Sequence, residues 1–136
     1  MAADYLHNLQ FEIDSDLRVI AIPKKGVVAG VEGDKDVNRI AFKIDKMYNG
    51  FDLSEFDFYI NYKNVEGTKG RYVVMDKTPE NELILFSWLV SDEVTAAKGT
   101  VTFAVELINH EESADAQRFN TTIGQLQVLE GLNSQT

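Results

Sequence analysis

Hydrophobic and polar side chains alternate along most of this chain, and this two-residue period constrains its fold more than any other feature. Successive side chains of a β-strand point to opposite faces, so a period of two predicts a strand with one buried face. The clearest case has Phe56, Phe58, Ile60 and Tyr62 on one face of the segment Phe56–Lys63. Further predicted strands are Leu9–Asp14, Leu17–Ile22, Asn38–Asp45, Arg71–Met75, Leu83–Val90, Thr100–Ile108 and Phe119–Leu129.

Turn-forming residues separate these segments about every ten residues, a spacing typical of β-sandwiches and small barrels. Because the first two segments are joined by a turn-prone pair, we expect them to form a hairpin. The turns are marked by Ser15-Asp16, Asn49-Gly50, Asn64–Gly70 and Pro79–Glu82.

One segment, Ser91–Lys98, has the composition of a helical turn that Gly99 would end. The chain is thus predicted to be an all-β sandwich of about eight or nine short antiparallel strands with at most one helical turn. We expect the domain to span residues 9–132, with an N-terminal tail at 1–8 and a C-terminal tail at 133–136.

Composition excludes several classes of partner and site. The 136 residues include no cysteine and carry a net charge of −9, from 13 basic and 22 acidic side chains. Nucleic acids and anionic membranes attract clustered cations, so neither is expected as a partner. Disulfides and cysteine-ligated metals are excluded. The N-terminus lacks the basic and apolar regions of a signal peptide, and no apolar run is long enough to span a bilayer.

An acidic loop is the first candidate site. Glu32, Asp34 and Asp36 place three carboxylates at alternate positions, which is how oxygen ligands gather around calcium. Calcium loops of helix–loop–helix proteins also need two flanking helices, and neither is predicted here. We therefore predict a solvated or partner-facing loop, with no metal site and no cofactor, and keep calcium binding as the less favoured interpretation.

Acidic side chains also raise the question of catalysis, because glycoside hydrolysis needs two carboxylates held across a sugar. Any acidic sandwich offers such pairs on its outer faces, so no catalytic residue is predicted and an enzyme is the least favoured class. The two histidines, His7 and His110, have no partner at the spacing of a metal site or a catalytic triad. The carboxylates considered are Glu12, Asp14, Asp57, Glu82 and Glu106.

Aromatic side chains are the remaining candidates, for a surface that binds a glycan or a partner protein. They are Tyr48, Phe51, Tyr59 and Tyr72. Tyr59 is out of phase with the buried positions of its strand and is expected to face solvent. Trp88 lies within the apolar run LILFSWLV, and burial preference predicts that it fills the core.

Two stretches carry a family resemblance. Ile84–Phe103, which contains LFSWLVSDEVTAAKGTVTF, resembles the "ITFSWxV…AxKGxVxFxV" core of an Ig-like domain of phage and prophage virion proteins of Gram-positive bacteria. Phe119–Leu132, FNTTIGQLQVLEGL, is similar to the "WNTT…VLEGL" stretch that closes that domain, with Phe119 in place of the tryptophan. Looser likeness upstream, in Phe11–Ile22, Gly30–Asp36 and Phe58–Tyr62, extends the resemblance over Leu9–Leu132.

The resemblance implies a non-enzymatic structural protein of a bacteriophage particle, made in the host cytoplasm and assembled into the virion. In that family the domain belongs to an upper-baseplate or tail-appendage protein and docks a longer receptor-binding or fibre region. Because this chain stops at Thr136, a second role is also expected, in which the module alone decorates the tail or the capsid surface. Other virion proteins are the expected partners and self-association is left open. The alternative is a carbohydrate- or host-surface-binding module.

Overall fold

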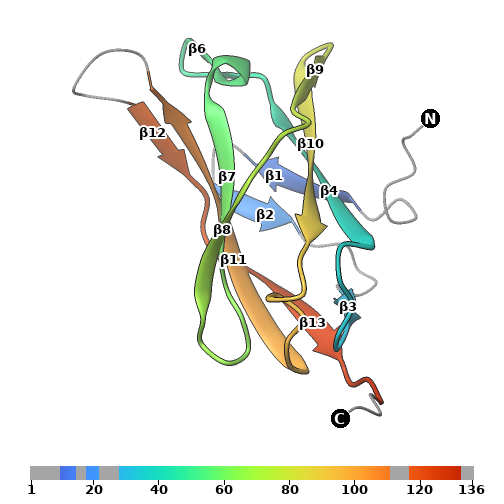
Figure 1. The fold of residues 1–136 in the computed structure, drawn as a ribbon. Coiled ribbons are helices and arrows are strands. Elements are labelled where there is room, and N and C mark those ends of the chain that lie inside the picture. The colour runs from blue at the N-terminus through green and yellow to red at the C-terminus, as the bar shows by residue number, and fades with distance from the viewer. Residues whose placement is uncertain (1–9, 15–17, 22–27, 111–116, 133–136) are drawn as a thin grey trace.

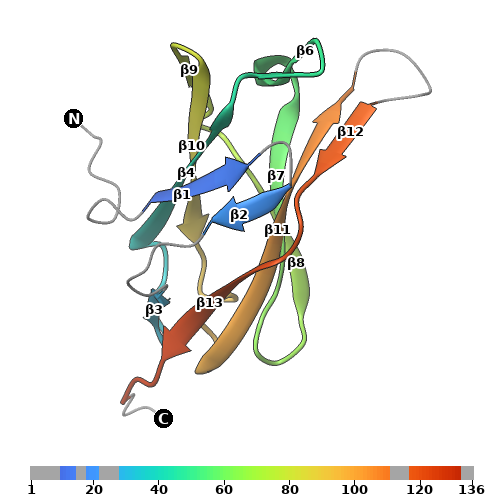
Figure 2. The ribbon, with the colours of Figure 1, turned by 180° about the vertical axis from the view of Figure 1, so that it is seen from behind.

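The computed structural model describes residues 10–14, 18–21, 28–110 and 117–132. The predicted tails, 1–8 and 133–136, and His7 lie outside the described residues. Two large β-sheets face each other, and a small two-stranded sheet lies at one end (Figures 1 and 2). The prediction of an all-β sandwich is therefore confirmed.

The first sheet has the strand order β2-β1-β4-β10-β9. The predicted hairpin is present, because β1 and β2 pair antiparallel. The longest pair is antiparallel too, with Ile84 of β10 opposite Ile44 of β4. The strands are β1 (Gln10–Asp14), β2 (Val19–Ala21), β4 (Asn38–Asp45), β9 (Thr78–Glu80) and β10 (Leu83–Val90).

The second sheet has the order β3-β13-β11-β7-β8, and β12 pairs with the far half of β11. The long strand β11 is thus bordered on one side by β7 and on the other by β13 and β12 in turn. The strands are β3 (Val28–Val31), β7 (Asp57–Lys63), β8 (Lys69–Val73), β11 (Gly99–Asn109), β12 (Gln117–Asn120) and β13 (Gly124–Leu129).

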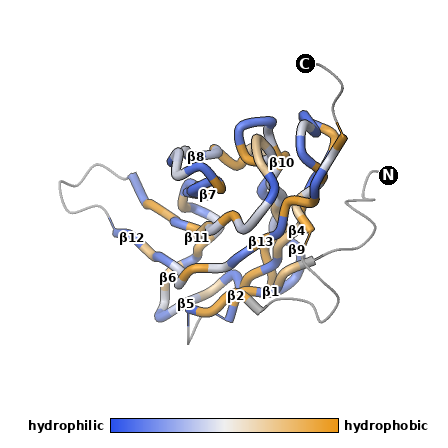
Figure 3. Tube along the Cα trace, turned by 90° about the horizontal axis from the view of Figure 1, so that it is seen from below, coloured by the Kyte–Doolittle hydropathy of each residue, from blue (hydrophilic) through white to orange (hydrophobic). Residues whose placement is uncertain are grey.

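The core lies between the sheets and is built from the hydrophobic phase of each strand, visible as alternating colours along the trace (Figure 3). Phe42 and Phe86 stack with ring centres 5.0 Å apart, and Phe58 of the opposite sheet meets Phe86 edge-on at 4.9 Å. Trp88 is 1% exposed and packs 5.3 Å from Phe103. Its predicted role as a core side chain is confirmed.

Thirteen strands occur in the described part of the chain, more than the eight or nine expected, because several are only two to four residues long. A tight hairpin joins β5 (Met47–Tyr48) to β6 (Phe51–Asp52), and the expected strand 119–129 is divided into β12 and β13. Two pairs, β1 with β4 and β3 with β13, are parallel rather than antiparallel. The alternation of side chains indicates which face of a strand is buried, but not whether the neighbouring strand runs parallel or antiparallel to it.

The helical turn lies elsewhere than predicted. Leu53–Glu55 forms a 3-10 turn whose N-cap, Asp52, accepts a hydrogen bond from the Ser54 N–H at 3.0 Å. Residues 91–98 instead form successive turns, and the Glu93 carbonyl accepts a hydrogen bond from the Asn64 side chain at 2.8 Å. Tertiary hydrogen bonds thus override a weak local preference. Among the described residues no helix is long and apolar enough to cross a bilayer.

Candidate interaction site

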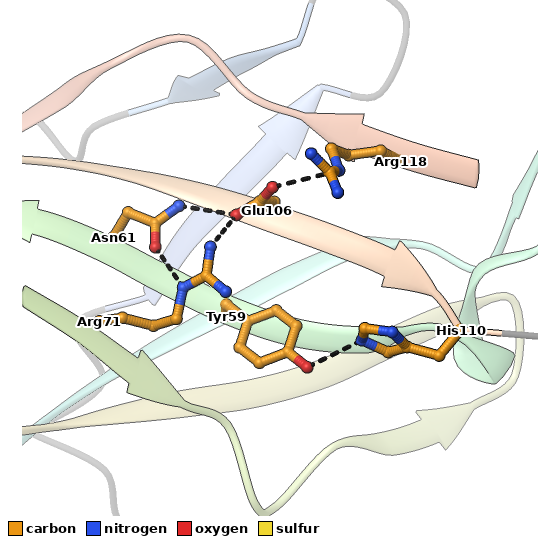
Figure 4. A network of polar contacts seen from close by, with 6 residues as sticks. All are labelled: Tyr59, Asn61, Arg71, Glu106, His110 and Arg118. Atoms are coloured by element: carbon orange, nitrogen blue, oxygen red, sulfur yellow. Dashed lines mark hydrogen bonds and ion pairs between the residues drawn. The ribbon is translucent and has the colours of Figure 1, made fainter. Parts of the chain in front are cut away.

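A buried carboxylate lies on the outer face of the second sheet. Glu106 of β11 points away from the core, since its neighbours Val105 and Leu107 are the inward residues, yet it is only 7% exposed. Side chains from three neighbouring strands cover it, and Figure 4 shows them converging on its carboxylate. We call this group the Glu106 network: Tyr59, Asn61, Arg71, Glu106, His110 and Arg118.

Cations and an amide satisfy the Glu106 carboxylate. Arg71 donates to Oε1, Asn61 Nδ2 donates to the same oxygen at 2.9 Å, and Arg118 Nε lies 3.4 Å from Oε2. Arg71 Nε also donates to Asn61 Oδ1 at 2.8 Å. Glu106 is therefore held as a structural anion that fixes two arginines on the surface.

Tyr59 extends this network toward the end of the sheet. The Arg71 guanidinium lies 4.6 Å from the centre of the Tyr59 ring, and the Tyr59 hydroxyl is hydrogen-bonded to His110 Nε2 at 3.0 Å. That nitrogen is also 3.6 Å from Asp57 Oδ2. The sequence analysis considered only metal-site and triad spacings for His110, and its partners Tyr59 and Asp57 were not predicted. Both contacts use one ring nitrogen, whereas a catalytic relay uses the two nitrogens separately.

Cations gather on this outer face of an otherwise acidic chain. Lys63 and Lys69 lie directly opposite each other on β7 and β8, an arrangement that like charges disfavour. They border an open depression of about 260 Å³ that Ala104 and Ile123 also line. Neither lysine is in an ion pair with a described residue. The face is therefore suited to acidic rather than basic partners.

A second depression, of about 150 Å³, lies between β12 and the β5–β6 hairpin. Tyr48 and Phe119 meet edge-on in it with ring centres 5.0 Å apart, and Phe51 and Phe56 meet at 6.3 Å. We call it the Arg18 pocket. Its lining residues are Arg18, Tyr48, Phe51, Leu53, Phe56, Gln117, Arg118 and Phe119.

The Arg18 guanidinium is held firmly in this pocket. Its carbon lies 4.0 Å from the Phe119 ring centre and 5.0 Å from that of Tyr48. Nη1 donates to the Asn120 carbonyl at 3.1 Å, and Nη2 donates to the Tyr48 hydroxyl at 3.0 Å. The Arg18 Nε is buried and has no hydrogen-bond partner among the described residues. Both acceptors are neutral, so no described carboxylate balances the positive charge.

Two pKa shifts mark side chains near these surfaces. Hydrogen bonds from the Ser54 hydroxyl and N–H hold the pKa of Asp52, beside the Arg18 pocket, below its ordinary value. Burial and a hydrogen bond of 2.5 Å to Glu93 raise the pKa of Tyr62 to about 12. The same Ser54 hydrogen bonds hold the turn that carries Leu53, and the raised pKa keeps Tyr62 neutral above pH 10.

The four aromatic candidates are divided among three places. Tyr48 and Phe51 come together in the Arg18 pocket, while Tyr59 belongs to the Glu106 network. Tyr72 of β8 is partly buried and packs against the core. The sequence analysis did not identify the arginines of either site, which are Arg18, Arg71 and Arg118. Arg71 and Arg118 lie in the outward phase of β8 and β12, a signal that becomes informative only when the strand register is known. Arg18 lies in the turn before β2.

Two carboxylates of the acidic loop, Asp34 and Glu32, accept hydrogen bonds from neighbouring parts of the fold. Asp34 Oδ2 accepts from the Val31 N–H at 3.0 Å and from Asn38 Nδ2 at 2.9 Å. Glu32 accepts from the backbone N–H groups of Gly131 and Lys98. Asp36 is exposed. In the residues that the structure describes, no three acidic or histidine side chains gather as a metal site.

The carboxylates considered for glycoside hydrolysis are spread over both sheets. Glu12 of β1 is paired with Lys43 at 3.2 Å on the first sheet. Asp57 and Glu106 lie on the second sheet, in the contacts described above. Glu82 is exposed beside β10, and Asp14 ends β1. Glu106, the most buried of them, already has two arginine partners.

Comparisons with known proteins point to one fold. No protein-family model matches the sequence, and no curated protein matches it. Among solved structures the chain is similar to the "N-terminal domain of phage TP901-1 ORF48", with a TM-score of 0.52 and 12% sequence identity. The two folds are alike. The match covers 90% of this chain and 97% of that one, so the resemblance to phage proteins is confirmed at the level of the fold.

Proposed function

We propose that this chain is a non-enzymatic structural module of a bacteriophage particle that docks on other virion proteins. The observation that carries the proposal is the likeness of fold to a phage protein domain over nearly the full length of both chains. The sequence motifs of the Ig-like virion domain support it independently, since they fall on β10, β11, β12 and β13. A baseplate, tail or capsid-surface position is compatible with such a module.

The surfaces described above suit docking better than catalysis. The two depressions, of about 260 and 150 Å³, are smaller than the 300–1,000 Å³ typical of small-molecule sites. Lys63 and Lys69 border the larger depression, and Arg18 and Arg118 border the smaller one. A face that presents cations in this way is suited to binding another protein by electrostatic complementarity.

Quantitative mass spectrometry of purified phage particles from the source tests the proposal. The copy number of this chain is measured against that of the major capsid protein. A ratio near one indicates decoration of the head, and a small multiple of the tail symmetry indicates a baseplate or tail component. Absence from purified particles would overturn the virion proposal.

A carbohydrate- or host-surface-binding module is the second candidate, because the Arg18 pocket joins aromatic rings with a guanidinium and a hydroxyl. A glycan array probed with the intact chain tests it. Binding that Phe51→Ala abolishes and Tyr59→Ala preserves would assign a glycan to this pocket. The two variants are matched because each replaces one aromatic side chain by alanine. Phe51 lines the pocket, whereas Tyr59 lies in the Glu106 network. A silent array counts against this candidate.

A further inference from the structure

We propose that the Arg18 pocket receives the carboxylate of an Asp or Glu side chain, carried by an extended segment of a partner protein that pairs with the free edge of β12. The inference rests on the proposed function, because it names the chemistry of the docking partner. Charge, pocket walls, pocket size and the strand edge each support it.

Charge is the first argument. A guanidinium has five N–H groups, and Arg18 directs two of them to neutral oxygens of Asn120 and Tyr48. Among the described residues no carboxylate is paired with Arg18, and its buried Nε has no acceptor. Arg18 is partly buried, and its Nε is fully so. A partly buried guanidinium with no paired carboxylate favours an anionic ligand.

The walls of the pocket hold Arg18 in a fixed orientation before any ligand arrives. Arg18 has a φ of 62°, a conformation that non-glycine residues rarely adopt. Its N–H donates to the Asp14 carbonyl and its own carbonyl accepts from the Thr122 N–H, both at 2.7 Å. Stacking on Phe119 fixes the guanidinium plane. Strained residues held in this way are found at ligand clamps, and a preorganised guanidinium loses little entropy on binding.

Size selects a single side chain. The volume of about 150 Å³ is roughly half the lower bound for small-molecule sites. One side chain with its carboxylate suits this space better than an oligosaccharide. The partly enclosed aromatic walls also suit the aliphatic stem of a glutamate.

The edge of β12 indicates how the partner presents that side chain. In the described structure β12 pairs with β11 alone, and Figures 1 and 2 show it at the margin of its sheet. Gln117, Arg118 and Phe119 of this strand line the pocket. An unpaired edge accepts an added strand through backbone hydrogen bonds, and adjacent pockets then select its side chains.

Nuclear magnetic resonance of the intact ¹⁵N-labelled chain tests the proposal. The probe is the capped peptide acetyl-Thr-Val-Thr-Glu-Thr-Val-Thr-amide, and the control peptide has Gln in place of Glu. We expect the Glu peptide to shift the Arg18 Nε–H resonance and the amide resonances of β12. The Gln peptide is expected to bind about tenfold more weakly, because it lacks the charge-assisted hydrogen bond. This comparison needs no variant that might fail to fold.

Matched variants add a second test. Arg18→Gln and Lys63→Gln each remove one positive charge, and only Arg18 lies in the pocket. We expect Arg18→Gln to abolish the preference for Glu over Gln, and Lys63→Gln to keep it. Equal binding of the two peptides by the intact chain overturns the proposal.

Two further outcomes also overturn it. Stronger shifts of Arg18 with sodium glucuronate than with the Glu peptide would assign the pocket to an acidic sugar. Shifts on concentrating the chain alone would assign it to a second copy. The peptide result is independent of the particle experiment, so failure of this inference is distinguishable from failure of the virion role.

Discussion

Trp88 shows how much a single residue contributes to this core. It is 1% exposed and lies between Phe103 and Tyr62, with ring centres at 5.3 and 5.8 Å. We expect Trp88→Ala to lower the free energy of unfolding by about 3–5 kcal/mol, through lost apolar burial and the cavity left behind. Urea unfolding monitored by circular dichroism measures this. Met75→Ala, at a residue that is 82% exposed, is the control and should change stability by less than about 0.5 kcal/mol.

Tyr62 gives a prediction about pH. An unfolded tyrosine ionises near pH 10, whereas burial and Glu93 raise the pKa of Tyr62 to about 12. Between these values the unfolded chain releases a proton that the folded chain keeps, so stability falls as pH rises. The contribution is complete below about pH 10 and lost as pH approaches 12.

Tyr62→Phe removes this ionisable group while keeping the ring. We expect the variant to lose less stability than the parent chain between about pH 10 and 12, measured by urea unfolding at each pH. Identical slopes for the two proteins in this range would contradict the assignment.

At the scale of elements, the sequence predicted the long strands well and the short ones poorly. The bounds of β4 and β10 agree with prediction, because both strands have continuous apolar patterns ended by polar turns. Short elements such as β5, β6 and β9 depend on a neighbouring strand more than on their own residues.

The candidate sites were only partly predictable for the same reason. Tyr48 and Phe51 are close because the Asn49-Gly50 turn lies between them, which is local information. Phe119 and Arg18 join them through pairings across the chain, and Glu106 meets Arg71 and Arg118 through strand register. Alternation gives the face of each side chain but not its cross-strand neighbour.

The β5–β6 hairpin supplies a prediction at this scale. Asn49 and Gly50 have φ of 49° and 84°, the pair of positive values that a two-residue type I′ turn requires. Beyond its two chain neighbours, no described residue has an atom within 4 Å of a Cβ added at Gly50, so backbone strain is what opposes Gly50→Ala. We expect a loss of about 1 kcal/mol in urea unfolding. Gly50→Asn is the matched control and should lose less, because asparagine tolerates this conformation. Equal losses would refute the turn assignment.

At the scale of the whole molecule, side chains from both sheets form one hydrophobic cluster. Unfolding should therefore be cooperative. The only tryptophan, Trp88, lies in this cluster, so its fluorescence reports on the core, while far-ultraviolet circular dichroism reports on the strands. We expect the two signals to give the same urea midpoint. Separate midpoints would mean that the sheets unfold independently.

The parallel pairing of β3 with β13 has a consequence for the order of events during protein synthesis. Val28 of β3 lies opposite Gln127 of β13, so about a hundred residues are translated between the two partners. β3, with the buried Ala29, therefore leaves the ribosome long before β13 has been synthesised. Such distant pairing slows folding and leaves unpaired strands exposed to aggregation. The nascent chain is therefore most exposed to aggregation in the interval before β13 emerges.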